Sequence, residues 1–116
     1  MGRFFSTPLS TQEIASSIQR KLDWILAACR PQTVILFGSA ARGTMTERSD
    51  VDLALIFSDN DSLRQARKDL FRYPPPDDRA QDLLFLTKEA YLTKASQGGV
   101  CEIIQAEGKA LFGEMP

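Results

Sequence analysis

The sequence predicts an α/β (α+β) domain in which a small mixed β-sheet carries helices mainly on one face. Short apolar runs at 34–37, 51–57 and 81–86 alternate with segments whose apolar residues recur every three or four positions. At 116 residues, the chain can bury one hydrophobic core but not two. We therefore expect residues 1–116 to form a single domain, with residues 1–9 as a flexible N-terminal segment.

The first helix is predicted to begin after Ser10. The run from Ser10 to Glu13 has the form of a capping box, in which the Ser10 hydroxyl accepts a hydrogen bond from the Glu13 amide. The apolar residues that follow at helical spacing are Ile14, Ile18, Leu22, Ile25, Leu26 and Cys29. Arg30-Pro31 ends the helix, whose apolar stripe should cover the sheet with Trp24 partly buried at its edge.

The segments after the second strand are also predicted from local patterns. Residues 58–61 supply turn and N-cap side chains for a helix. The side chains expected to point inward from it are Leu63, Ala66, Leu70 and Phe71. Its outward basic side chains are Arg64, Arg67, Lys68 and Arg72, a set suited to solvent, to an acidic partner or to nucleotide phosphates. The three prolines at 74–76 form a stiff connection to the third strand. The last elements are expected to be helices over 88–95 and 100–107 and an edge strand over 109–112.

Composition excludes several classes of function. The net charge is −1, so no overall field favours nucleic acid or an anionic membrane. Without histidine, the chain cannot use Ser-His or Cys-His catalysis or a histidine-based zinc site, so any metal must be held by oxygen. The N-terminus is too polar for a signal peptide or a membrane span. Cys29 and Cys101 are expected to be buried free thiols, which fits a cytoplasmic protein.

The stretch from Val34 to Phe57 organises the rest of the chain. Two strand-forming runs enclose a loop of small residues, and the second run starts with Asp50 and carries Asp52 two places later. Because side chains alternate along a strand, both carboxylates should share one face, with Cα atoms roughly 6.5 Å apart at about 3.3 Å of rise per residue. Carboxylates in a strand that is buried on both sides are costly without a cation, although a cap and a solvated edge position are the structural alternatives.

The loop after the first strand is suited to binding phosphate. Gly38 permits a tight turn whose backbone N–H groups face outward, and Ser39 adds a hydroxyl donor. A short helix should follow and end at Gly43 in a left-handed conformation. Arg42 could either contact a phosphate or cap that helix. The loop lacks the lysine of a Walker A motif and the glycine spacing of a dinucleotide-binding motif.

The run Gly38-Ser39-Ala40-Ala41-Arg42-Gly43, five further residues and then Ser49-Asp50-Val51-Asp52-Leu53 resembles the signature of the minimal nucleotidyltransferase (MNT) family, within the polymerase β-like nucleotidyltransferase superfamily. The resemblance implies the fold of that superfamily, nucleotide binding by Gly38, Ser39, Arg42 and Ser49, and catalysis by Asp50, Asp52 and a third acid. The family's third acid falls on Asp82, the only charge in the third strand. Asp77 and Asp78 are its rivals by proximity, and the structural alternative for Asp82 is a strand-end residue facing water.

Nucleotidyl transfer explains why acids would be needed at this point. Mg²⁺ held by carboxylates neutralises the triphosphate and lowers the pKa of the attacking hydroxyl, and the expected site holds two ions about 3.5–4 Å apart. We expect Asp50, Asp52 and Asp82 to be the metal ligands. Asp82 should also help to deprotonate the acceptor hydroxyl.

Three functions remain open from the sequence. MNT proteins resemble the antitoxins of toxin–antitoxin pairs whose partners are helical HEPN ribonucleases, which implies transfer of AMP from ATP onto a tyrosine of the toxin. The alternatives are a binding module that neutralises its partner by covering it, and a small-molecule nucleotidyltransferase such as an antibiotic-modifying enzyme. The chain has no room for a second domain that holds the acceptor, so a partner protein or a homo- or hetero-oligomer is expected to supply that site.

Overall fold

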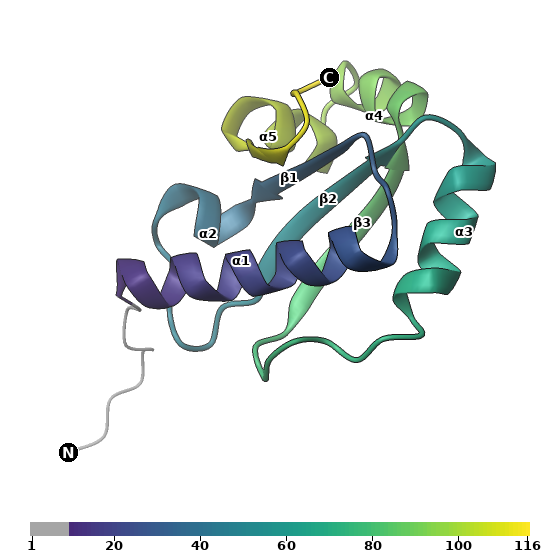
Figure 1. Ribbon diagram of the computed structural model, residues 1–116. Helices are drawn as coiled ribbons and strands as arrows, with labels where there is room; N and C mark the ends of the chain where they lie inside the picture. Colours follow the sequence, from purple (N-terminus) through teal and green to yellow (C-terminus); the bar gives the residue numbers. More distant parts are fainter. Residues whose placement is uncertain (1–9) are drawn as a thin grey trace.

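The computed structural model describes residues 10–116, so the predicted flexible segment 1–9 lies outside the described residues. Its elements follow one another in the predicted order (Figure 1). They are α1 (Thr11–Ala28), β1 (Thr33–Phe37), α2 (Gly38–Arg42), β2 (Val51–Phe57), α3 (Asn60–Leu70), β3 (Gln81–Thr87), α4 (Lys88–Ala95), α5 (Val100–Glu107) and β4 (Lys109–Phe112).

The four strands form one mixed sheet in the order β3-β2-β1-β4. Strand β1 pairs antiparallel with both β2 and β4, whereas β2 and β3 are parallel and are connected through α3. A parallel pair requires such a crossover, because the chain must return to the starting end of the sheet. As a result, β2 and β3 begin at the same end of the sheet.

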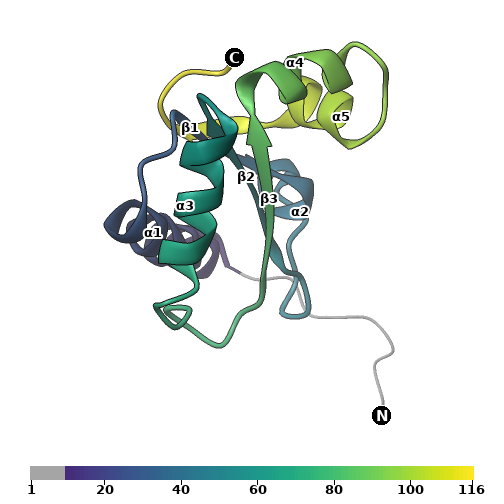
Figure 2. The same cartoon turned by 90° about the vertical axis from the view of Figure 1, so that its right-hand side faces the viewer.

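Helices α1 and α3 cover one face of the sheet (Figures 1 and 2). The predicted cap is confirmed, since Ser10 Oγ accepts a hydrogen bond from the Glu13 amide at 3.1 Å. Beneath these helices lies the larger core cluster, which includes Ile25 of α1 and Val51, Leu53 and Leu55 of β2. The odd-numbered residues of β2 therefore face α1 and α3, as the alternation of a strand requires.

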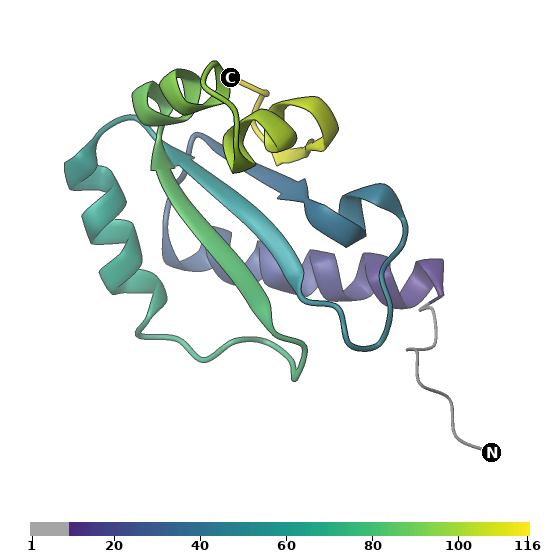
Figure 3. The ribbon, with the colours of Figure 1, turned by 180° about the vertical axis from the view of Figure 1, so that it is seen from behind.

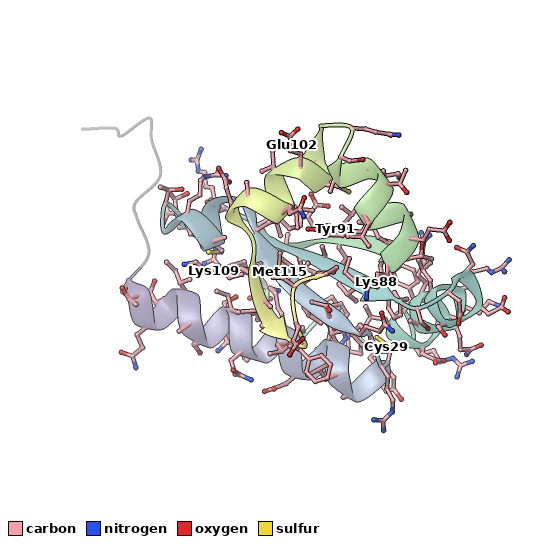
Figure 4. All side chains as sticks on the ribbon, turned by 90° about the horizontal axis from the view of Figure 1, so that it is seen from above. Cys29, Lys88, Tyr91, Glu102, Lys109 and Met115 are labelled. Atoms are coloured by element: carbon pink, nitrogen blue, oxygen red, sulfur yellow. The ribbon has the colours of Figure 1, made fainter. Side chains whose placement is uncertain are left out.

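Helices α4 and α5 cover part of the opposite face. Here Ala54 and Ile56 of β2 pack in a smaller cluster with Tyr91 of α4 and Ile104 of α5. Figure 4 shows Tyr91 beneath α4, on the other side of the sheet from Cys29. Figure 3 shows that the starting ends of β2 and β3 lie clear of both helices. The predicted fold class is confirmed, but the helices expected mainly on one face cover both faces. The face under α4 and α5 is open where the acidic residues lie.

Phe71 and the two cysteines were predicted to be buried. Phe71 was expected to point inward from α3, but it follows the last residue of that helix and is 73% exposed. Phe71 still has helical backbone angles, and successive helical residues are rotated by about 100°, so its ring lies off the stripe of Leu63, Ala66 and Leu70. The two cysteines are free and buried, as predicted, and belong to different core clusters.

No helix between residues 10 and 116 combines the length and the apolar character needed to cross a membrane.

Candidate active site

The sheet brings together two acids that are 30 positions apart in the sequence. Asp52 of β2 lies directly beside Asp82 of β3 in the parallel register. Adjacent strands lie about 4.8 Å apart, so their side chains leave the same face as close neighbours. Asp50 immediately precedes β2, where the Val51 amide donates to the Ala80 carbonyl at 3.0 Å and continues the pairing. Asp52 is half-buried, whereas Asp50 and Asp82 are exposed.

Gly38 makes room for the Asp52 carboxylate. Phe37, the last residue of β1, pairs with Asp52, so the glycine turn begins beside this acid. Gly38 has a φ of +72°, and a Cβ atom at that position would lie 2.0 Å from Asp52 Oδ2. Any other residue would therefore be strained in its backbone and would collide with the carboxylate. The predicted turn is present, and its glycine is needed for both reasons.

In the described part of the chain, the three acids at the starting ends of β2 and β3 accept no hydrogen bond from a side chain. Burial raises the pKa of Asp52 above its ordinary value, the negative charges of Asp82 and Asp50 raise it further, and Arg42 opposes these effects. Within residues 10–116, no side-chain hydrogen bond or ion pair involves any of the three acids. The site therefore carries mutually repelling negative charge that a cation would relieve.

The donor set suits a hard cation, since three carboxylates lie near the starting ends of β2 and β3 and Mg²⁺ prefers oxygen ligands. The three side chains are not gathered into a ready-made centre: among the described residues, no three acidic or sulfur side chains lie close enough together to hold a metal ion. The chemistry of the residues fits a divalent cation, but their arrangement is not that of a finished metal cluster.

The loop between β1 and β2 has the predicted backbone, and Arg42 makes one ion pair within the chain. Helix α2 spans Gly38–Arg42, and Gly43 follows with a φ of +76°. The Arg42 guanidinium pairs with Glu107 of α5 at 3.3 Å. This pair holds the guanidinium against α5. Arg42 is still near enough to Asp52 for its charge to act on that carboxyl.

Ser49 holds a turn just before the acids. Its Oγ accepts from the Thr46 amide at 2.9 Å and lies 3.3 Å from the Thr46 hydroxyl. This contact closes residues 46–49 into a compact turn that leads into Asp50. Ser39 lies in the first turn of α2, where its carbonyl accepts from the Gly43 and Thr44 amides. The nucleotide-binding roles of Gly38, Ser39, Arg42 and Ser49 stay predictions.

A polar network that was not predicted from the sequence lies beneath the acids, on the opposite face of the sheet. The Lys21 side chain of α1 is fully buried and donates to Asp77 Oδ1 at 2.7 Å and to Gln81 Oε1 at 2.8 Å. Asp77 also accepts from Ser17 at 3.2 Å and from Arg20. A signal was available, because Lys21 interrupts the apolar stripe between Ile18 and Ile25. A lysine at such a position needs an acid partner.

Arg79 links the two segments that carry the acids. Its guanidinium donates to the carbonyl oxygens of Thr46 at 3.3 Å, Glu47 at 3.1 Å and Ser49 at 3.1 Å. Its own backbone carbonyl accepts from Lys21. The chain just before β2 is thereby tied to the chain just before β3. Asp77 takes part in this network, so it is not a free rival to Asp82 as the third acid.

Comparisons with known proteins identify the family of the chain. Residues 20–114 match the family described as "Polymerase beta, Nucleotidyltransferase". No curated protein matches the chain.

Several solved structures share the fold. One is a crystal structure of a toxin–antitoxin with AMP-PNP, with a TM-score of 0.53 and 22% identity over 86% of this chain and 73% of that one. Another is a protein from Sulfolobus solfataricus proposed to be a nucleotidyltransferase, with a TM-score of 0.53 and 15% identity over 91% of both chains. The family match covers most of the sequence, and the chain belongs to the polymerase β nucleotidyltransferase family.

Proposed function

We propose that this protein is a Mg²⁺-dependent nucleotidyltransferase that moves AMP from ATP onto a tyrosine hydroxyl of a partner protein, a HEPN-type toxin, and so acts as an antitoxin. The observation that carries the proposal is the pairing of Asp52 with Asp82 beside Gly38. Asp50 lies close to this pair, and no side-chain donor from the residues that the structure describes compensates the carboxylates. A structure with a similar fold is that of a toxin–antitoxin crystallised with AMP-PNP. It supports ATP as the substrate and a toxin as the partner.

In the proposed reaction, the acceptor oxygen attacks the α-phosphorus of ATP. A new P–O bond forms, the bond to the bridging oxygen breaks and pyrophosphate leaves. Asp82, the most peripheral of the three acids in the sheet, takes the proton of the acceptor hydroxyl. The backbone amides at Gly38 and Ser39 hold the phosphates. Asp50, Asp52 and Asp82 would hold Mg²⁺, which when bound supplies charge neutralisation of the triphosphate.

The proposed location is the cytoplasm, where ATP is abundant. Cys29 and Cys101 are both unpaired thiols, and free thiols are the usual state of cysteine in that compartment.

Incubation with Mg²⁺, α-³²P-labelled ATP and a co-expressed partner tests the proposal. We expect label on the partner, and we expect no label when both Asp50 and Asp52 are replaced by asparagine. Unchanged labelling by that double variant would refute the assignment of the acids. Label on an aminoglycoside instead of the partner would indicate the small-molecule enzyme.

Neutralisation by occlusion is the second candidate. It is favoured by the absence of a preassembled metal cluster in residues 10–116. It predicts that the partner binds tightly and loses activity without becoming labelled. It also predicts that the double asparagine variant neutralises the partner as well as the wild type does.

A further inference from the structure

A groove with a volume of about 470 Å³ lies at the β3 edge of the sheet. Its walls are α1, the end of α3, the proline connection and β3. The lining side chains are Trp24, Arg67, Phe71, Arg72, Tyr73, Pro74, Pro75, Gln81, Leu83 and Phe85. Leu83 and Phe85 alternate with Asp82 along β3, so the groove opens on the face opposite the candidate active site.

The groove exposes an unusual amount of aromatic surface. Phe71 is 73% exposed and Tyr73 is 54% exposed, which makes them the most exposed of the large apolar side chains in the described chain. On the floor of the groove, the Phe85 ring stacks on Phe57 with centroids 6.1 Å apart. Large exposed apolar side chains gathered around a hollow are typical of a protein interaction site.

The charge of the groove is of one sign. Its lining contains two guanidinium groups and no carboxylate. Arg67 lies over the Phe85 ring, 5.3 Å from its centroid, so its donors are held at the rim. Arg72 makes only a long, exposed contact of 3.7 Å with Asp69, which is weak enough to be exchanged for another carboxylate. Guanidinium groups beside aromatic rings suit a carboxylate that is next to a large apolar side chain.

The backbone beside the groove is also available. β3 is the outermost strand on its side of the sheet, and within residues 10–116 no other strand pairs with its outer edge. An edge strand offers unpaired N–H and C=O groups that an extended segment can use. A segment lying along this edge would direct alternate side chains toward Leu83 and Phe85.

From these observations we propose that the groove docks an extended acidic segment of a partner protein, one that alternates carboxylates with large apolar side chains. The carboxylates pair with Arg67 and Arg72, and the apolar side chains pack against Phe71 and Tyr73. The inference deepens the proposed function only in requiring a partner. It does not depend on transfer chemistry, and its test uses no magnesium and no partner.

Trp24 reports directly on the groove, because it lines the groove and is the chain's single tryptophan. The probe is a short synthetic peptide that alternates glutamate with leucine and phenylalanine. Its counterpart has lysine in place of glutamate. We expect the acidic peptide to change Trp24 fluorescence and the indole N–H resonance in a saturable way, and the basic peptide to leave both unchanged.

Matched variants separate the groove from general electrostatics. Arg67→Glu with Arg72→Glu should weaken the binding of the acidic peptide by about tenfold or more, since each charge reversal places two negative charges together. Arg64→Glu with Lys68→Glu, on the same helix but outside the groove, should retain most of the affinity. Phe71→Ser with Tyr73→Ser tests the apolar contribution at two exposed positions. Circular dichroism checks that each variant folds.

Four results would overturn the proposal. The acidic peptide could fail to perturb Trp24, or the basic peptide could perturb it equally. The control variant with Arg64→Glu and Lys68→Glu could lose as much affinity as the variant with Arg67→Glu and Arg72→Glu. ATP alone could give a response that depends on Arg67 and Arg72, which would identify a phosphate site instead. None of these results bears on nucleotidyl transfer, which the labelling experiment measures separately.

Discussion

Two aspartates near the same end of the sheet have opposite electrostatic environments. Burial acts to raise the pKa of Asp77, but the hydrogen bond and charge of Lys21, together with Ser17 and Arg20, hold it below its ordinary value. Burial also acts on Asp52, where the charges of Asp82 and Asp50 raise the pKa further. Asp77 thus has its cations within the chain, whereas Asp52 has two like charges for neighbours and only Arg42 to oppose them.

This difference distinguishes a structural acid from a candidate functional one. On the face under α1 the charged groups are satisfied, because Lys21 has three hydrogen-bond acceptors and Asp77 has several donors. The other face leaves Asp52 without a donor, beside Asp82 in register. Gln81 and Asp82 are consecutive residues of β3 and belong to these two different environments, since strand side chains alternate. A carboxylate left uncompensated by a fold that compensates its neighbour is available for an external cation.

The largest expected effect comes from making the same substitution in both regions. Asp52→Asn should reduce nucleotidyl transfer by about 10³-fold or more, equivalent to about 4 kcal/mol, with no loss of stability, because it removes a cation ligand and a repulsion. Asp77→Asn should instead lower the free energy of unfolding and spare transfer in the fraction that remains folded. Labelling and urea titration measure the two effects. If both variants behaved alike, the contrast between the two acids would be wrong.

Removal of the buried Lys21 ammonium group should cause the largest loss of stability. Lys21→Met leaves Asp77 and Gln81 without their donor, and we expect a loss of about 3 kcal/mol, as is typical when one partner of a buried ion pair is removed. Arg20→Gln is the control, since Arg20 is half-exposed and its pair with Asp77 should contribute less than about 1 kcal/mol. Equal losses in urea unfolding would contradict the central role of Lys21.

A pair of glycines tests the space around Asp52. Gly38→Ala should destabilise the protein by about 2 kcal/mol and reduce transfer, because it combines left-handed backbone strain with a collision at Asp52 Oδ2. Gly43→Ala has a similar φ of +76° but meets no atom within 4 Å, so strain of about 1 kcal/mol is the only cost expected. If the two variants had the same stability and activity, close contact between Gly38 and Asp52 would be excluded.

The smallest effect is a pH dependence of opposite sign. The lowered pKa of Asp77 contributes stability above its ordinary value of 3.8, and this is lost as the pH falls through the lowered pKa. The raised pKa of Asp52 contributes stability below 3.8 that is lost as the pH rises through the raised pKa. Unfolding titrations should therefore find that Asp77→Asn approaches the wild type in acid. Asp52→Asn should gain stability relative to the wild type as the pH rises above 3.8. Parallel curves for the two variants would contradict these shifts.

Much of the fold could be predicted because its signals are local. The cap at Ser10, the left-handed Gly43 and the two strands around the glycine turn each depend on neighbouring residues. The prediction for Phe71 was wrong because the residue that follows a buried helical position is rotated by about 100° out of the apolar stripe. The network of Lys21 was missed because its partners lie 56 to 60 positions away.

The sequence by itself determined the strands, the turn between them and the presence of acids on one of them, since these depend on side-chain alternation and local backbone preference. Only the tertiary structure decided that Asp82 lies beside Asp52, that Asp77 belongs to Lys21, that Arg42 reaches Glu107 and that an arginine-rimmed groove forms at β3. These contacts join residues far apart in the chain. They therefore depend on strand register and helix packing, which no local pattern specifies.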